Sequence, residues 1–107
     1  MDPGKLRHKV TIQQQGESIK DGYGALVENW TDVKIVSASV EPLSGRELFA
    51  AQQVHSEITT RIKTRYRAGI TSKMRIMFGS RIYDILAPID PEERHRELHL
   101  MCRELIP

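Results

Sequence analysis

The chain has 107 residues, of which 39% are hydrophobic and 28% are charged, with seven glycines and five prolines. This is the composition of an ordinary globular domain, and the length predicts one domain over residues 1–107 rather than a disordered or fibrous protein. No apolar run approaches the roughly 18 residues that cross a membrane, and the first residues lack the hydrophobic stretch of a signal peptide. We therefore expect a protein that stays in the cytoplasm and has no membrane partner.

The formal net charge of +2 conceals an uneven distribution. Residues 58–83 contain seven basic side chains and no acidic one, whereas the rest of the chain holds nine basic and fourteen acidic side chains. A molecule with this asymmetry can meet an acidic partner on one side and a basic partner on another.

The first third of the chain predicts two strands and the connection between them. Residues 6–14 alternate, with Val10 and Ile12 on one face and Thr11 on the other, as in a half-buried strand. Residues 15–28 are polar and rich in glycine, which predicts a loop or a wide hairpin turn. Residues 30–40 return to strand residues but in mixed phase, which predicts a bulge or a strand that is buried on both faces.

A short helix is predicted after Pro42. Ser44 and Glu47 have the spacing of a capping box, and Leu43 and Leu48 occupy the positions of a hydrophobic staple. Good helix formers follow, so we expect a helix over residues 45–54. If the cap forms, Ser44→Ala should cost about 1 kcal/mol.

The clearest strand signal lies in residues 58–67, where apolar residues and threonines alternate with basic side chains. Residues 73–78 and 81–86 then predict a hairpin, because two residues separate them, with Arg75 opposite Asp84 and Ile76 opposite Tyr83.

The C-terminal stretch allows two interpretations. Pro91 after Asp90 is typical of a helix start, whereas Leu98, Leu100 and Cys102 alternate as in a strand. We favour a turn over residues 90–95 and a final strand. The predicted fold class is mainly β: a small β-barrel or sandwich of five to six short strands, with one short helix inserted between strands.

Catalytic motifs are missing from the sequence. There is no glycine-rich phosphate loop, no nucleophile elbow and no zinc-protease motif. His95, His99 and Cys102 would share a face as metal ligands only if the C-terminus were helical. Cys102, the single cysteine, is most simply a small buried hydrophobe. We therefore expect no enzyme activity, no metal and no cofactor.

The basic row of Arg61, Lys63, Arg65 and Arg67 is the strongest functional constellation, because alternation places all four on one face. Such a row suits a phosphate backbone or an acidic protein surface, and it is also typical of a solvated sheet face. Trp30 predicts a core anchor, with an interface anchor as the alternative, and Tyr23 predicts either a packing lid or an interface anchor.

Four segments together resemble the head-tail joining proteins of long-tailed bacteriophages, also called head-closure or stopper proteins. They are the basic strand of residues 5–12, the Asp21-Gly22-Tyr23-Gly24 loop that leads to Trp30, the junction of residues 40–47 and the strand of residues 58–70. The likeness covers nearly the whole chain, and the order of the four segments makes it specific.

The resemblance implies a structural protein of phage or prophage origin that forms a ring beneath the portal and adaptor rings, closes the DNA-filled head and accepts the tail. The protein would act in the virion, after assembly in the host cytoplasm, and would be monomeric or weakly associated in isolation. Residues 41–57 would reach toward the DNA channel. The candidate partner-binding or channel-facing residues are Arg61, Lys63, Arg65, Arg67, Tyr23, Ser44, Arg46, Glu47, Leu48 and Phe49.

Two other functions compete with this one. The basic row also fits a small basic nucleic-acid-binding β-barrel protein. A metal-dependent enzyme requires the helical C-terminus.

Overall fold

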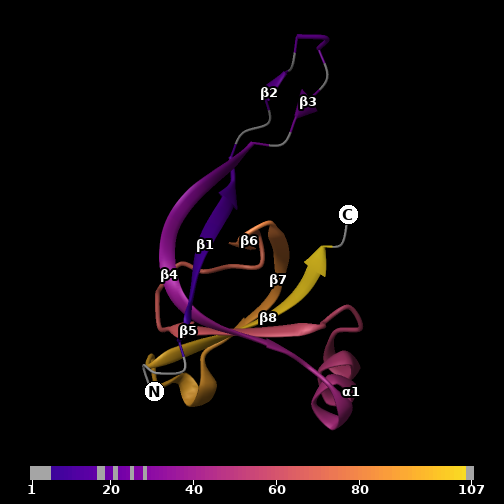
Figure 1. Ribbon diagram of the computed structural model, residues 1–107, viewed down its shortest axis with the longest axis vertical. Coiled ribbons are helices and arrows are strands. Elements are labelled where there is room, and N and C mark those ends of the chain that lie inside the picture. Colours follow the sequence, from indigo (N-terminus) through magenta and orange to yellow (C-terminus); the bar gives the residue numbers. More distant parts are fainter. Residues whose placement is uncertain (1–5, 17–18, 21, 25, 28, 106–107) are drawn as a thin grey trace.

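Six antiparallel strands close into a barrel in the computed structural model, which describes residues 6–16, 19–20, 22–24, 26–27 and 29–105 (Figure 1). The order around the barrel is β1-β4-β5-β8-β7-β6, and β6 pairs with β1 to complete the circle. The fold is therefore mainly β, and the barrel is the correct one of the two predicted architectures. The six strands are β1 (His8–Gln15), β4 (Trp30–Pro42), β5 (Thr60–Arg65), β6 (Met74–Phe78), β7 (Arg81–Ile89) and β8 (Glu97–Leu105).

Strands β1 and β4 show how the alternation positions the core. Val10 and Ile12 of β1 point into the barrel and are buried, as predicted. The mixed phase of β4 has the predicted bulge as its cause: Ile12 pairs with Lys34 but Gln13 pairs with Asp32, so Val33 is left over. The alternative of burial on both faces is wrong, because Val33 and Ile35 are exposed.

The segment between β1 and β4, predicted as a loop or a wide hairpin turn, contains a two-stranded antiparallel arm. It contains β2 (Ile19–Lys20) and β3 (Leu26–Val27), which pair only with each other. At the base of the arm the Gly16 amide donates a hydrogen bond of 2.6 Å to the Asn29 carbonyl oxygen. Figure 1 shows the arm extending away from one end of the barrel, which makes the molecule elongated, 47 × 27 × 25 Å.

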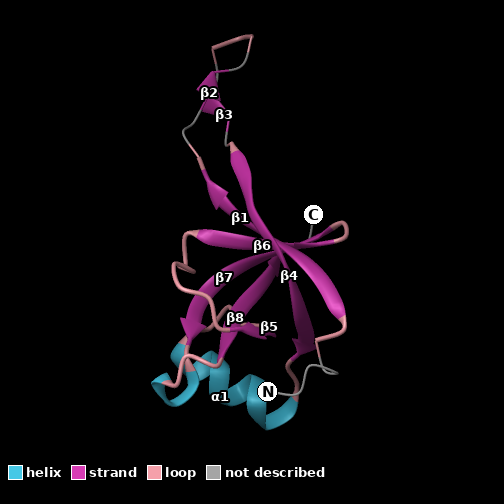
Figure 2. Cartoon of the chain, turned by 90° about the vertical axis from the view of Figure 1, so that its left-hand side faces the viewer, coloured by secondary structure: helices cyan, strands magenta, loops and turns pink. Residues whose placement is uncertain are grey.

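Helix α1 (Gly45–Val54) spans the predicted residues and lies between β4 and β5, at the end of the barrel opposite the arm (Figure 2). The predicted capping box is wrong. Ser44 occupies the N-cap position but its side chain makes no capping hydrogen bond, and the Glu47 carboxylate pairs with Arg61 at 3.6 Å. Gly45 has a φ of +57°, a left-handed conformation that glycine adopts without strain, and this residue makes the turn into the helix.

The core has two parts. The larger fills the barrel and is formed by inward side chains of all six strands, Tyr83 being the largest. The smaller lies between α1 and the barrel, where Leu48 and Ala51 cover Leu43, Ile58 and Met101. Leu43 and Leu48 both belong to this cluster, as the predicted hydrophobic staple requires.

The β6–β7 hairpin has the predicted register, with Arg75 opposite Asp84 and Ile76 opposite Tyr83. Gly79 begins the turn with a φ of +60°, as a type II′ turn requires at its first central residue.

The C-terminal stretch forms a single 3₁₀ turn, η2 (Pro91–Glu93), and then β8. The helical alternative is therefore wrong. Cys102 lies inside the barrel and packs as a core residue, and burial raises the pKa of its thiol well above the ordinary value.

Candidate functional site

The basic row lies on the outer wall of the barrel, but only three of its four members belong to the strand. Thr60, Ile62 and Thr64 of β5 are buried, so the residues between them point outward. Arg61, Lys63 and Arg65 follow one another on this wall, whereas Arg67 lies beyond the end of β5 at Arg65. The prediction that one strand aligns all four is therefore wrong for Arg67.

Glu41 neutralises the first half of this row. Its carboxylate on β4 lies 3.2 Å from Arg61 Nη2 and 3.6 Å from Lys63 Nζ, because Glu41 and Arg61 are direct partners in the β4–β5 ladder. The Ser39 hydroxyl donates a third interaction, at 2.9 Å. Partial burial acts to raise the pKa of Glu41, but the hydrogen bonds from Ser39 and Arg61 and the two positive charges outweigh it and lower the pKa.

The second half of the row, Arg65 and Arg67, forms no ion pair with the described residues. Arg65 is exposed and stands opposite Glu97 of β8, but the Glu97 carboxylate is occupied by His99 Nε2 at 2.9 Å. Within the described part of the chain, the ion pairs of the row involve Arg61 and Lys63 alone. The row is thus a mixed patch that ends in two available guanidinium groups, Arg65 and Arg67.

Helix α1 links to this patch through one ion pair. Arg61 reaches Glu47 as well as Glu41, and Gln52 Nε2 donates a hydrogen bond of 3.0 Å to the Ile58 carbonyl oxygen. Leu48 faces the barrel, so among the predicted helix residues Glu47 and Leu48 join the helix to the wall. Ser44, Arg46 and Phe49 are exposed instead, and Phe49 and Val54 leave 69% and 86% of their surface open.

Tyr23 lies far from the other predicted residues. It sits at the tip of the arm, in the turn between β2 and β3, and is 98% exposed. Since the arm and α1 extend from opposite ends of the barrel, the predicted site residues form two separate surfaces (Figure 2). The exposure of Tyr23 contradicts a packing lid.

The root of the arm contains a polar ladder that sequence reasoning missed. The Arg75 guanidinium stacks over the Trp30 ring at 4.0 Å and its Nε donates to Gln13 at 2.8 Å, while Gln13 donates to Asp32 at 2.7 Å. Trp30 is half-buried in this ladder on the outer wall, so the prediction of a core anchor is wrong. In the sequence, the only signal of this polar ladder was the predicted hairpin register, which places Arg75 on the outer face of the barrel.

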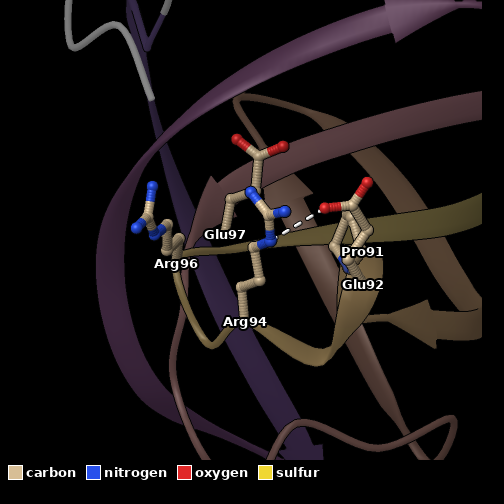
Figure 3. Close-up of a pocket in the computed structure, with 5 residues that line it drawn as sticks. All are labelled: Pro91, Glu92, Arg94, Arg96 and Glu97. Atoms are coloured by element: carbon tan, nitrogen blue, oxygen red, sulfur yellow. Dashed lines mark ion pairs between the residues drawn. The ribbon is translucent and has the colours of Figure 1, made fainter.

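A shallow pocket lies in the β7–β8 connection, lined by Pro91, Glu92, Arg94, Arg96 and Glu97 (Figure 3). Arg94 Nε pairs with the Glu92 carboxylate at 2.8 Å, and Arg96 points away from the other four side chains. The connection is strained: Glu92, Glu93 and His95 all have φ values between +55° and +57°. The Asp90 carboxylate stabilises this connection, because it accepts a hydrogen bond from the His95 backbone amide and lies 2.8 Å from His95 Nδ1.

The described residues bring together no group of three or more side chains suited to hold a metal ion. His99 belongs to β8 and pairs with Glu97, whereas His95 lies in the preceding connection beside Asp90. No helix in the part of the chain that the structure describes is long and apolar enough to cross a membrane.

Comparisons with known proteins agree with one another. The family model described as phage head completion protein matches residues 1–105. Head completion protein gp16 of Bacillus phage SPP1 is 32% identical over 82 residues, which cover 76% of this chain and 74% of that protein. The solution structure of protein SF1141 from Shigella flexneri 2a is similar, with a TM-score of 0.72 and 30% identity over 97% of this chain and 96% of that one.

A chain in the virion of a native gene transfer agent particle shares the fold. Its TM-score is 0.59 at 17% identity, over 94% of this chain and 96% of that chain.

Proposed function

This chain belongs to the phage head completion protein family, whose members are structural proteins rather than enzymes, and we propose that it closes the DNA-filled phage head as a ring-forming stopper at the head-tail junction. In this proposal one face of the ring meets the adaptor or portal ring and the other accepts the tail. The protein assembles in the host cytoplasm and ends in the virion. The match of the family model over residues 1–105 is the observation that carries the proposal.

The α1 end of the barrel is the part that we place toward the DNA channel. The β4–β5 connection is long enough to carry a helix, and that helix has no fully buried residue. Its attachment consists of half-buried Leu48 and Ala51, one side-chain hydrogen bond from Gln52 and one ion pair from Glu47. An element held by so few contacts can shift without unfolding the barrel, as closure and opening of a channel require.

Arg65 and Arg67 are the members of the basic row that we assign to contact with DNA or an acidic ring. Arg61 and Lys63 are engaged by Glu41, so a change at Arg61 would disturb the fold as well as a surface. The test is therefore the double variant Arg65→Glu/Arg67→Glu, supplied to particles that lack the native protein. The matched control is Lys73→Glu/Arg96→Glu, which makes the same change of charge at two exposed positions outside the row.

Normal heads that lose their DNA or fail to accept tails are the expected result for the Arg65/Arg67 variant, with the control behaving as the native protein. Each exposed ionic contact contributes about 0.2–1 kcal/mol, which becomes large only when a ring repeats it. A normal phage titre with a folded Arg65/Arg67 variant would remove these two residues from the proposal. A normal titre without the protein altogether would refute head closure itself.

Nucleic-acid binding by the isolated barrel remains the second candidate, and the two available arginines are the observation that favours it. Two unpaired arginines in the row predict weak binding of DNA that salt abolishes, because affinity for DNA grows with the number of phosphates neutralised. Titration of a short DNA duplex at two salt concentrations distinguishes the candidates: tight binding at physiological salt would favour the nucleic-acid-binding protein.

A further inference from the structure

A row of polar side chains runs around the outer wall of the barrel, across five adjacent strands. Its members are direct partners in the ladders that join β4, β1, β6, β7 and β8, and in this order they are Asp32, Gln13, Arg75, Asp84 and Arg103. Direct partners point to the same face of a sheet. This face is the outer one, because the strand neighbours Ile76 and Tyr83 are buried in the core. We call these five residues the polar row.

The polar row connects two distant parts of the molecule. At the root of the arm, the Arg75 guanidinium lies over the Trp30 ring at 4.0 Å. On the other side, Arg103 Nη2 lies 2.9 Å from the Asp84 carboxylate, and its Nη1 lies 3.0 Å from the carboxylate of Glu57. Glu57 belongs to the connection between α1 and β5. The row therefore extends from the arm to the connection that follows α1, and the arm and α1 lie at opposite ends of the barrel (Figure 2).

One step of the row is unusual, because Arg75 and Asp84 form no ion pair. Every other step between neighbouring members has a hydrogen bond within the described residues. Arg75 and Asp84 have opposite charges and are direct partners, and the Cβ atoms of such partners lie about 4.5–5.5 Å apart, within reach of an arginine side chain. Arg75 nevertheless turns toward Trp30, and Asp84 is held by Arg103 instead. One carboxylate thus lies between two arginines, and one of these arginines has a second place to go.

We propose that Arg75 is a switch with two positions, over Trp30 as seen here or on Asp84, and that Arg103 decides between them. While Arg103 neutralises Asp84, a second guanidinium gains little there, and Arg75 is held by its cation–π contact with Trp30. When the α1–β5 connection moves and Glu57 draws Arg103 away, Asp84 becomes an unpaired, half-buried carboxylate and attracts Arg75. The Trp30 ring is then uncovered, and the root of the arm loses one of its contacts.

A movement of α1 reaches the arm in this way. The helix is held to the barrel by few contacts, so the connection that follows it can move without unfolding the barrel. The coupling acts in both directions, since anything that displaces Arg75 from Trp30 brings it to Asp84 and weakens the hold of Arg103 there. The switch links the end that we place toward the channel to the opposite end of the molecule. It goes beyond head closure, because it is a property of the single chain.

The fluorescence of Trp30 tests the switch, because Trp30 is the only tryptophan of the chain. Quenching by acrylamide, which is uncharged, measures how well the guanidinium covers the ring in the purified protein. Arg75→Met removes the guanidinium and sets the upper limit of the quenching constant. Arg103→Met is expected to reach the same limit, although Arg103 stands on β8, two strands away from Arg75 on β6, because Asp84 then draws Arg75 off the ring.

The decisive variant is Arg103→Met/Asp84→Asn. Arg75 then has no carboxylate to move to, so the quenching constant should return to the native value. Asp84→Asn alone should also keep the native value. Arg103→Gln, which removes the same charge, takes the place of Arg103→Met if circular dichroism shows that the methionine variant is unfolded.

The matched control is Arg81→Met, which breaks another ion pair between β7 and β8, the one of 2.6 Å with Glu104, and should leave quenching unchanged. Native quenching in folded Arg103→Met would overturn the switch. A double variant that stays at the upper limit, or a rise in Arg81→Met, would overturn it as well, since either result means that the wall loosens without Arg75 changing partners. All measurements use the purified chain, so they do not depend on whether the protein closes heads.

Discussion

Glu41 is the single carboxylate on which the packing of the β5 wall depends. It faces Arg61 and Lys63 across the β4–β5 ladder and accepts a hydrogen bond from Ser39. Arg61 in turn reaches the helix through Glu47, so Arg61 connects the Glu41 contacts between β4 and β5 to α1. Removing the acid would leave two half-buried cations facing each other.

Glu41→Gln should therefore lower the free energy of unfolding at neutral pH by about 1 kcal/mol, a typical value for a hydrogen-bonded, partly exposed charge pair. Because the folded-state pKa of Glu41 lies below the ordinary 4.5, its contribution is complete above pH 4.5 and is lost as the pH falls through the folded-state value. Urea unfolding at neutral and at acid pH measures this: the difference between native and variant should shrink in acid. Glu93→Gln, an exposed carboxylate with no ion pair described, is the control, and an equal effect there would contradict the role of Glu41.

The local sequence assigns the start of helix α1 to a Ser44 cap, but in the structure Gly45 matters more for this start than Ser44. Ser44 makes no side-chain capping bond, whereas Gly45 adopts a φ of +57° that an L-residue adopts only under strain. Ser44→Ala should change stability by less than about 0.5 kcal/mol, and Gly45→Ala should cost about 1 kcal/mol. A Cβ at Gly45 would meet nothing within 4 Å, so the cost is purely conformational. Thermal unfolding of the two variants decides, and a larger effect at Ser44 would show that the cap forms in solution.

At the scale of elements, the periodicity of the sequence predicted the strands of the barrel. The period of two in β1, β5 and β8, and the two-residue spacing between β6 and β7, predicted strands and even a register, because adjacent strands share one short turn. The two strands of the arm were missed, although a wide hairpin turn was one of the two predictions for this segment, because each strand is only two residues long and shows no alternation.

The ion pairs were missed for a different reason. Glu41 and Arg61 stand 20 residues apart and meet only because β4 and β5 pair with a particular register across the helix connection. The same holds for closure of the barrel, which depends on pairing between β1 and β6. Long-range pairing of this kind has no local signature, so neither the neutralised half of the basic row nor the choice between barrel and sandwich was predictable.

Helix α1 should open more readily than the six strands of the barrel. A helix of ten residues is marginal in isolation, and this one has no fully buried residue. Leu48→Ala removes its main apolar contact with the cluster around Leu43 and Met101. We expect the free energy of local opening to fall by about 1 kcal/mol, less than for a fully buried leucine.

Hydrogen exchange with mass spectrometry measures this effect, with faster exchange expected in α1 and unchanged exchange in β1 and β6. Phe49→Ala is the matched control, because Phe49 is the next residue on the helix and is 69% exposed. Equal acceleration in both variants would contradict the docking role of Leu48, and acceleration throughout the barrel would show that α1 does not open independently.

At the scale of the whole molecule, a closed barrel leaves few ways to associate. Closure removes the open sheet edges through which β proteins otherwise pair, so contacts between copies must use side chains on the wall, the arm or α1. The outward apolar side chains of Ile35, Met77, Ile82 and Leu105 lie along a line that is one residue wide on each strand. A contact of this width is small compared with the roughly 1,200–2,000 Å² that stable interfaces bury.

The isolated chain should therefore sediment at micromolar concentration as a single species close to its monomer mass of 12.3 kDa. Weak contacts become stable when a template ring presents many subunits at once, because each further contact is then intramolecular in effect. Raising the concentration should shift the average mass upward gradually, and Ile35→Ser should abolish that shift while leaving the fold intact, since Ile35 is 63% exposed. Sedimentation velocity over a concentration series, with Tyr23→Ser as a control at an exposed side chain on the tip of the arm, provides the measurement. A closed ring that persists at micromolar concentration without any partner would contradict template-dependent assembly.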